Sequence, residues 1–163
     1  MKKRSREVLT AVLLGGIIAA TIDIFAASII SSRSPAYIMQ VIAGGLLAEA
    51  TFDGGMGTMV LGAILQWVMG VLIAAIYVVV SKFIPALRRR WILSGLAYGV
   101  VIFFVMNYVV LPLSAWKSMP HFTLVRFAAN MAAMLLFGLI VAFLCRRLSV
   151  SAPPAQGETA NPA

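Results

Sequence analysis

Apolar residues fill four long runs of this chain, and short polar segments separate the runs. The runs cover Val8–Ile30, Met56–Val80, Trp91–Leu111 and Thr123–Cys145. A helix needs about 20 apolar residues to cross the ~30 Å hydrocarbon core of a bilayer, and each run meets that length. The pattern predicts an all-α integral membrane protein with four transmembrane helices, of which Pro112 ends the third.

The segments outside these runs are short. The first run has the basic start of a secretory signal peptide, but it exceeds about 15 residues and contains Asp23, so we expect it to remain as a span. Residues 81–90 should form a short basic loop. We expect one domain over residues 1–148 and a disordered, Pro/Ala-rich cytoplasmic tail over residues 149–163.

A shorter apolar run, Ala36–Ala50, lies between the first two long runs. As a helix it would reach only about 22 Å, less than the hydrocarbon core. Pro35 suits the first position of this helix, and a cluster of glycines follows it. We expect a short re-entrant or buried helix on the outer side that does not cross the membrane, with Asp53 as the N-cap of the next span.

Composition and charge support a membrane protein. The chain is 62% hydrophobic and 11% charged, and its mean hydropathy is +1.01. A soluble domain has about a quarter of its residues charged. The net charge of +8 does not indicate nucleic acid, because the basic residues flank apolar runs, where they set topology and contact lipid headgroups. The expected partners are the bilayer and a second copy or another membrane protein.

The basic residues also predict the orientation. With four spans, ten of them share one side: Lys2, Lys3, Arg4, Arg6, Lys82, Arg88, Arg89, Arg90, Arg146 and Arg147. Three fall on the other side: Arg33, Lys117 and Arg126. The side richer in Lys and Arg is cytoplasmic, so both termini should be cytoplasmic. A fifth span would place Lys82 and the Arg88–Arg90 run outside, which argues against it.

Polar side chains gather in the outer halves of the spans and around the short helix, whereas the inner halves contain almost none. The set is Asp23, Glu49, Asp53, Gln66, Asn107, Arg126 and Asn130. Polar groups in lipid are costly unless they are paired. We therefore expect Arg126 to form an ion pair with Asp23 or Glu49, and the amide side chains to complete one network.

Small residues recur at helical spacing along three of the spans. The stripes are Gly15, Ala19 and Asp23; Gly62, Gln66, Gly70 and Ala74; and Gly95, Gly99 and Asn107. Small residues at this spacing allow helix backbones to approach closely. The polar residues on these stripes should therefore point into the bundle.

Two functional hypotheses follow, and neither is enzymatic. His121 has no Asp, Glu or Cys at ligand spacing, and Cys145 ends an apolar run, so no metal, cofactor or catalytic site is expected. The polar set either holds the helices together in an accessory or structural membrane component, or forms a proton-responsive site in an oligomeric channel or transporter. In the second case Asp23 or Glu49 would titrate beside Arg126.

Three segments carry a resemblance to a known family. They are LLAEATFDGGMGTMVLGAILQW, residues 46–67, then Ala75–Tyr77, and GLAYGVVIFFVMNYVVLPLSA, residues 95–115. Within about residues 15–144 the chain resembles small bacterial inner-membrane proteins of the YagU-like kind, a family of uncharacterised activity. The resemblance implies a bacterial inner membrane and assigns no reaction.

Overall fold

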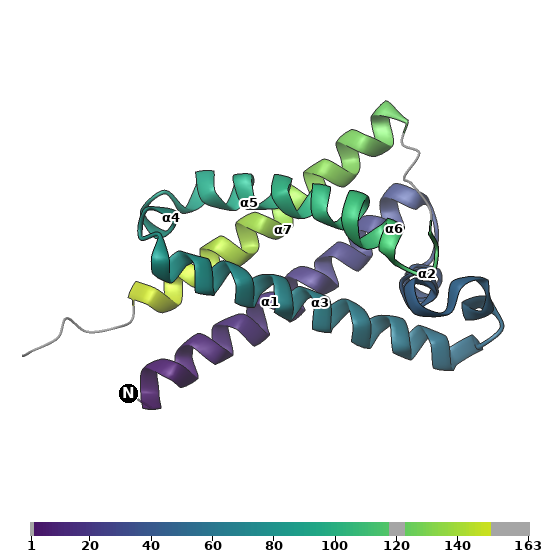
Figure 1. The fold of residues 1–163 in the computed structure, drawn as a ribbon, viewed down its shortest axis with the longest axis horizontal. Coiled ribbons are helices and arrows are strands. Elements are labelled where there is room, and N and C mark those ends of the chain that lie inside the picture. Colours follow the sequence, from purple (N-terminus) through teal and green to yellow (C-terminus); the bar gives the residue numbers. More distant parts are fainter. Residues whose placement is uncertain (1, 118–122, 151–163) are drawn as a thin grey trace, which may run out of the picture.

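The computed structural model describes residues 2–117 and 123–150 (Figure 1). Its elements are α1 (Lys2–Ser31), α2 (Pro35–Leu47), the 3-10 helix η1 (Ala48–Phe52), α3 (Gly55–Phe83), α4 (Ala86–Arg89), α5 (Trp91–Val105), the π-helical η2 (Met106–Val110), α6 (Leu111–Leu113) and α7 (Leu124–Val150). No strand occurs in these two ranges. The predicted all-α class is therefore confirmed.

Four helical stretches are long and apolar enough to cross a membrane. They are Val8–Ser31, Gly55–Phe83, Trp91–Leu113 and Leu124–Arg147. Each matches a predicted span, with bounds that differ by a few residues. The predicted loop over residues 81–90 is partly helical, since α3 continues to Phe83 and α4 follows. Helix α7 continues through Val150, and residues 151–163 of the predicted tail lie outside the described residues.

The elements divide between the two ends of the bundle. The start of α1, the short helix α4 and the end of α7 lie on the same side of the bundle, at left in Figure 1, which we call the α4 end. Helices α2 and α6 lie at the opposite end, which we call the α2 end. Helix α2 and η1 thus stay at the end of the bundle where α1 ends and α3 begins. The chain crosses the bundle four times, as predicted.

The four long helices cross in pairs. Helices α1 and α7 slant one way in Figure 1, and α3 and α5 slant the other way. At the α1–α3 crossing, a Cβ added to Gly16 would lie 2.5 Å from the Val71 Cα, and one added to Gly70 would lie 2.6 Å from the Gly16 carbonyl oxygen. The backbones can approach this closely only because both positions lack a side chain.

Helices α5 and α7 approach through a second set of glycines. A Cβ at Gly99 would lie 2.5 Å from the Met134 carbonyl oxygen, and one at Gly138 would meet the carbonyl of Gly95. Gly95 and Gly99 belong to a predicted stripe, so the close approach inferred from it is confirmed. Gly138, on the partner helix, completes the crossing.

Local sequence accounts for both ends of α2. The Ser34 Oγ accepts a hydrogen bond from the Tyr37 N–H at 3.2 Å, and Pro35 occupies the first turn as predicted. The helix ends at Leu47, before the predicted Ala50, because Ala48 has a φ of 51° and its N–H bonds to the Gly44 carbonyl.

The third span does not end at Pro112, which corrects the prediction. Proline lacks an N–H and its ring crowds the carbonyl four residues earlier, so the helix widens into η2 just before it. The Leu111 N–H there bonds to the Met106 carbonyl, five residues back. Helix α6 then continues through Pro112 to Leu113.

Candidate functional site

A pair of hydrogen bonds joins α1 to α3 in the half of the bundle nearer the α2 end. Gln66 Nε2 donates to Asp23 Oδ2 at 2.9 Å, and it lies 3.5 Å from the Ala20 carbonyl oxygen. Beside it, the Trp67 indole N–H donates to the Thr21 hydroxyl oxygen at 3.2 Å. Lipid supplies no such donors within its core, so each helix satisfies polar groups of the other.

The α1–α3 crossing brings Asp23 and Gln66 together. Gln66 lies one turn from Gly70, and Asp23 lies two turns from Gly16, on the same side of the closest approach. The predicted α3 stripe is therefore confirmed in facing a neighbouring helix. Both side chains are half-buried.

The predicted α1 stripe points into the bundle as expected, since Ala19 is 1% exposed and Asp23 bonds to Gln66. Its residues meet two different helices. Gly16 and Ala20 face α3, whereas a Cβ at Gly15 would meet Leu144 of α7 at 3.3 Å. Asp23 follows Ala20 by three residues and shares its face. The rotation of α1 is thus set by the position of its closest contact with α3.

The predicted ion pair of Arg126 with Asp23 or Glu49 is not formed. Arg126 is exposed in the first turn of α7, and within the described ranges no acidic side chain pairs with it. Asn130 Nδ2 donates to the Arg126 carbonyl oxygen at 2.9 Å, and Asn107 Nδ2 donates to the carbonyl four residues before it at 2.8 Å. Both amide side chains therefore bond within their own helices, and the predicted network that joins them to Gln66 and Arg126 is not formed.

Glu49 and Asp53 lie away from the helix interfaces. Glu49 is exposed in η1, and Asp53 is exposed in the turn that follows. Asp53 is not the N-cap of α3, which corrects the prediction. Gly54 holds that position without a side-chain hydrogen bond, and the Thr58 hydroxyl instead donates to the Gly55 carbonyl oxygen at 3.0 Å.

Trp116 holds α2 to the segment that follows α6. Its indole N–H donates to the Val41 carbonyl oxygen at 3.0 Å, and its ring lies where a Cβ of Gly44 would stand. The Ala115 N–H donates to the Gly45 carbonyl oxygen at 2.8 Å. Nothing in the sequence pattern indicated a contact of Trp116 with α2.

A row of side chains covers the α2 end beside Trp116. The Arg33 guanidinium lies 5.1 Å from the centre of the Tyr37 ring, and Tyr37 stacks on Phe52 at 5.5 Å. Phe52 in turn lies 6.2 Å from Trp116. Beneath this row, Thr51 is fully buried, and its hydroxyl donates to the Gln40 carbonyl oxygen. The α2 end is therefore a packed layer that ties η1 to α2.

The other half of the bundle contains a polar cluster that sequence reasoning missed. Tyr77 is 1% exposed, its hydroxyl lies 2.8 Å from the Ser94 Oγ, and its ring lies 5.0 Å from that of Tyr98. Nearby, Ser81 Oγ lies 3.5 Å from the Cys145 sulfur, and both residues are buried. The expectation of almost no polar residues in the inner halves is wrong. Tyrosine and serine on a shared helix face were the available signal.

Within the described ranges, no three His, Cys, Asp or Glu residues lie close enough to hold a metal ion, and His121 lies outside those ranges. What the arrangement does is satisfy polar groups between or within helices. Comparisons with protein-family models, curated proteins and solved structures gave no match.

Proposed function

We propose that this protein is a non-enzymatic accessory or structural component of a membrane, in which intramembrane polar groups hold the helices in register. The Asp23–Gln66 hydrogen bond carries the proposal, because it lies beside the α1–α3 crossing and is made between two groups of the protein itself. Such bonds contribute about 0.6 kcal/mol each on average, while an unpaired group would cost more.

The hydrogen bonds and exposure of the other polar residues also support an accessory or structural role. Asn107 and Asn130 bond to carbonyls of their own helices, and Arg126, Glu49 and Asp53 are exposed at the α2 end. A conduit would require polar groups that face one path. In a chain with this arrangement, that path would have to be built by several copies, so a proton- or solute-coupled oligomer is the competing function.

We further propose a bacterial inner membrane with the α4 end in the cytoplasm. The family resemblance favours that membrane. The orientation is supported by the basic residues, since ten of the 13 Lys and Arg residues belong to elements at the α4 end and three to elements at the α2 end. Both termini would then be cytoplasmic. The proposed partners are the bilayer and a second copy or another membrane protein, with no nucleic acid.

Substitution of Asp23 by Asn separates the accessory role from the conduit. Asparagine retains an oxygen that can accept from Gln66 but cannot release a proton near neutral pH. For an accessory component, Asp23→Asn should leave the abundance and the oligomeric state unchanged, and neither protein should carry protons into proteoliposomes.

The matched control is Asp53→Asn, which removes one carboxylate at an exposed turn. If the unmodified protein and Asp53→Asn carry a pH-driven proton flux in proteoliposomes, and Asp23→Asn loses it at equal abundance, the conduit is correct and the accessory role is wrong.

A further inference from the structure

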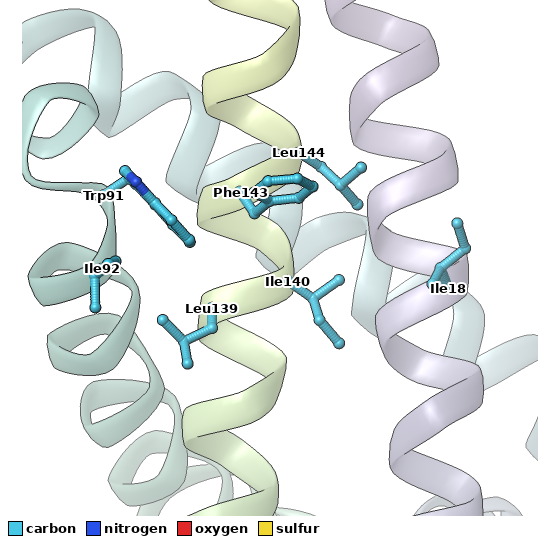
Figure 2. Close-up of a pocket in the computed structure, with 7 residues that line it drawn as sticks. All are labelled: Ile18, Trp91, Ile92, Leu139, Ile140, Phe143 and Leu144. Atoms are coloured by element: carbon cyan, nitrogen blue, oxygen red, sulfur yellow. The ribbon is translucent and has the colours of Figure 1, made fainter.

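An apolar groove runs along the surface of α7, between α5 and α1. Figure 2 shows Leu139, Ile140 and Phe143 of α7 at its floor, with Trp91 of α5 on one side and Ile18 of α1 on the other. The groove has a volume of about 500 Å³, and its lining is wholly apolar. A hollow of this chemistry in a membrane-spanning surface accommodates hydrocarbon and offers nothing to a polar solute.

Cations lie directly over the aromatic side chains at one end of the groove. The Arg146 guanidinium lies 5.6 Å from the centre of the Trp91 ring, and that of Arg147 lies 5.1 Å from the centre of the Phe143 ring. The two rings are 5.6 Å apart. The guanidinium groups are therefore held by cation–π contacts at the α4 end of an otherwise apolar surface.

The charge around this end is strongly one-sided. Arg89 and Arg90 immediately precede Trp91, and both are exposed. The described part of the chain places ten basic residues at the α4 end and one acidic residue, Glu7. An anion near Arg146 and Arg147 would thus meet a favourable potential from several directions.

We propose that the groove binds one anionic phospholipid. An acyl chain would lie along Ile18, Leu139 and Ile140, and the phosphate would lie beside Arg146 and Arg147. Guanidinium groups donate paired hydrogen bonds to phosphate oxygens. Trp91 begins α5, and its indole N–H has no acceptor among the described residues, so it can donate to a lipid ester carbonyl.

The apolar groove and the arginines at its end together indicate which molecule occupies it. Hydrocarbon alone would fit any lipid, but the cations select an anionic headgroup. A second copy of this chain would bring the same cations to the same place and would be repelled there. The inference is independent of the proposed accessory role, since it involves neither Asp23 nor Gln66.

Native mass spectrometry of the full chain in detergent tests the proposal, with phosphatidylglycerol and phosphatidylcholine added as matched probes. We expect one phosphatidylglycerol to be retained at least about tenfold better than phosphatidylcholine. The variant Arg146→Gln/Arg147→Gln should lose that preference. The control Arg6→Gln/Lys82→Gln removes the same charge at the same end, outside the groove, and should keep it within about twofold.

A second variant tests the groove without changing the charge. Ile140→Trp places a larger side chain on the groove floor and should reduce phosphatidylglycerol retention, while circular dichroism reports whether the helices remain. Equal retention by the unmodified protein and by Arg146→Gln/Arg147→Gln would overturn the proposal. So would equal losses in the control, displacement of the lipid by millimolar inorganic phosphate, or a stable dimer that buries the groove.

Discussion

The Tyr98 hydroxyl donates to the backbone carbonyl oxygen of Ile73 at 2.6 Å, which joins α5 to α3. Beside this bond, the Tyr77 hydroxyl of α3 lies 2.8 Å from the Ser94 Oγ of α5, and the two tyrosine rings lie 5.0 Å apart. Each helix therefore sends one tyrosine to a polar group of the other. The glycine crossings bring α1 to α3 and α5 to α7. Packing of α1 against α7 joins the two pairs, and these tyrosines add hydrogen bonds between α3 and α5.

Removal of the Tyr98 hydroxyl should weaken the contact between the pairs. Tyr98→Phe retains the ring and loses the bond to Ile73, so we expect the free energy of unfolding to fall by about 0.6 kcal/mol and by no more than about 1.7. Reversible unfolding with SDS in mixed micelles measures the change. Tyr108→Phe is the control, because Tyr108 is exposed at the bundle surface. Equal losses in both variants would argue against a role for the Tyr98 bond.

Addition of one methyl group at Gly138 should separate α5 from α7. The new Cβ would meet the Gly95 carbonyl and would lie 2.7 Å from the Gly99 nitrogen, so a backbone must shift. We expect Gly138→Ala to lower the unfolding free energy by about 1–3 kcal/mol. At Gly57 the same change meets nothing within 4 Å and should be neutral or slightly stabilising. A silent Gly138→Ala variant in the same unfolding assay would mean that the crossing is looser than described.

A double-mutant cycle tests whether Asp23 and Gln66 depend on each other. Gln66→Leu leaves the carboxylate without its donor and should destabilise the protein by about 1–3 kcal/mol. Asp23→Leu/Gln66→Leu removes both polar groups and should recover most of that loss. SDS unfolding of the unmodified protein, Asp23→Leu, Gln66→Leu and the double variant gives the coupling free energy between the two side chains. Additive losses would show that the two side chains do not interact.

Cysteine labelling tests the orientation. Cys145 is the sole cysteine of the chain and is buried beside Ser81, so Cys145→Ser provides a conservative background. In that background, Lys117→Cys should react with a membrane-impermeant maleimide in intact cells, and Arg89→Cys should react only after lysis. Labelling of Arg89→Cys from outside would reverse the proposed topology.

The membrane class and the four spans could be predicted from the sequence. Lipid selects for runs of about 20 apolar residues with charges at their ends, and this requirement acts on each segment separately. The same reasoning located the short helix between α1 and α3, its start at Pro35, and the grouping of the basic residues by element. These features depend on residues adjacent in sequence and on the lipid or water around each segment.

The pairing of side chains was decided by the tertiary structure. Gly16 faces α3 whereas Gly15 faces α7, and the spacing of small residues did not indicate which helix each position meets. Arg126 is exposed, and Asn107 donates to a carbonyl of its own helix. The contacts of Tyr77 and Tyr98 required the successive helices α3 and α5 to present matching faces to each other. Rotation and crossing point depend on backbone contacts between helices, and residue spacing within one helix leaves them undetermined.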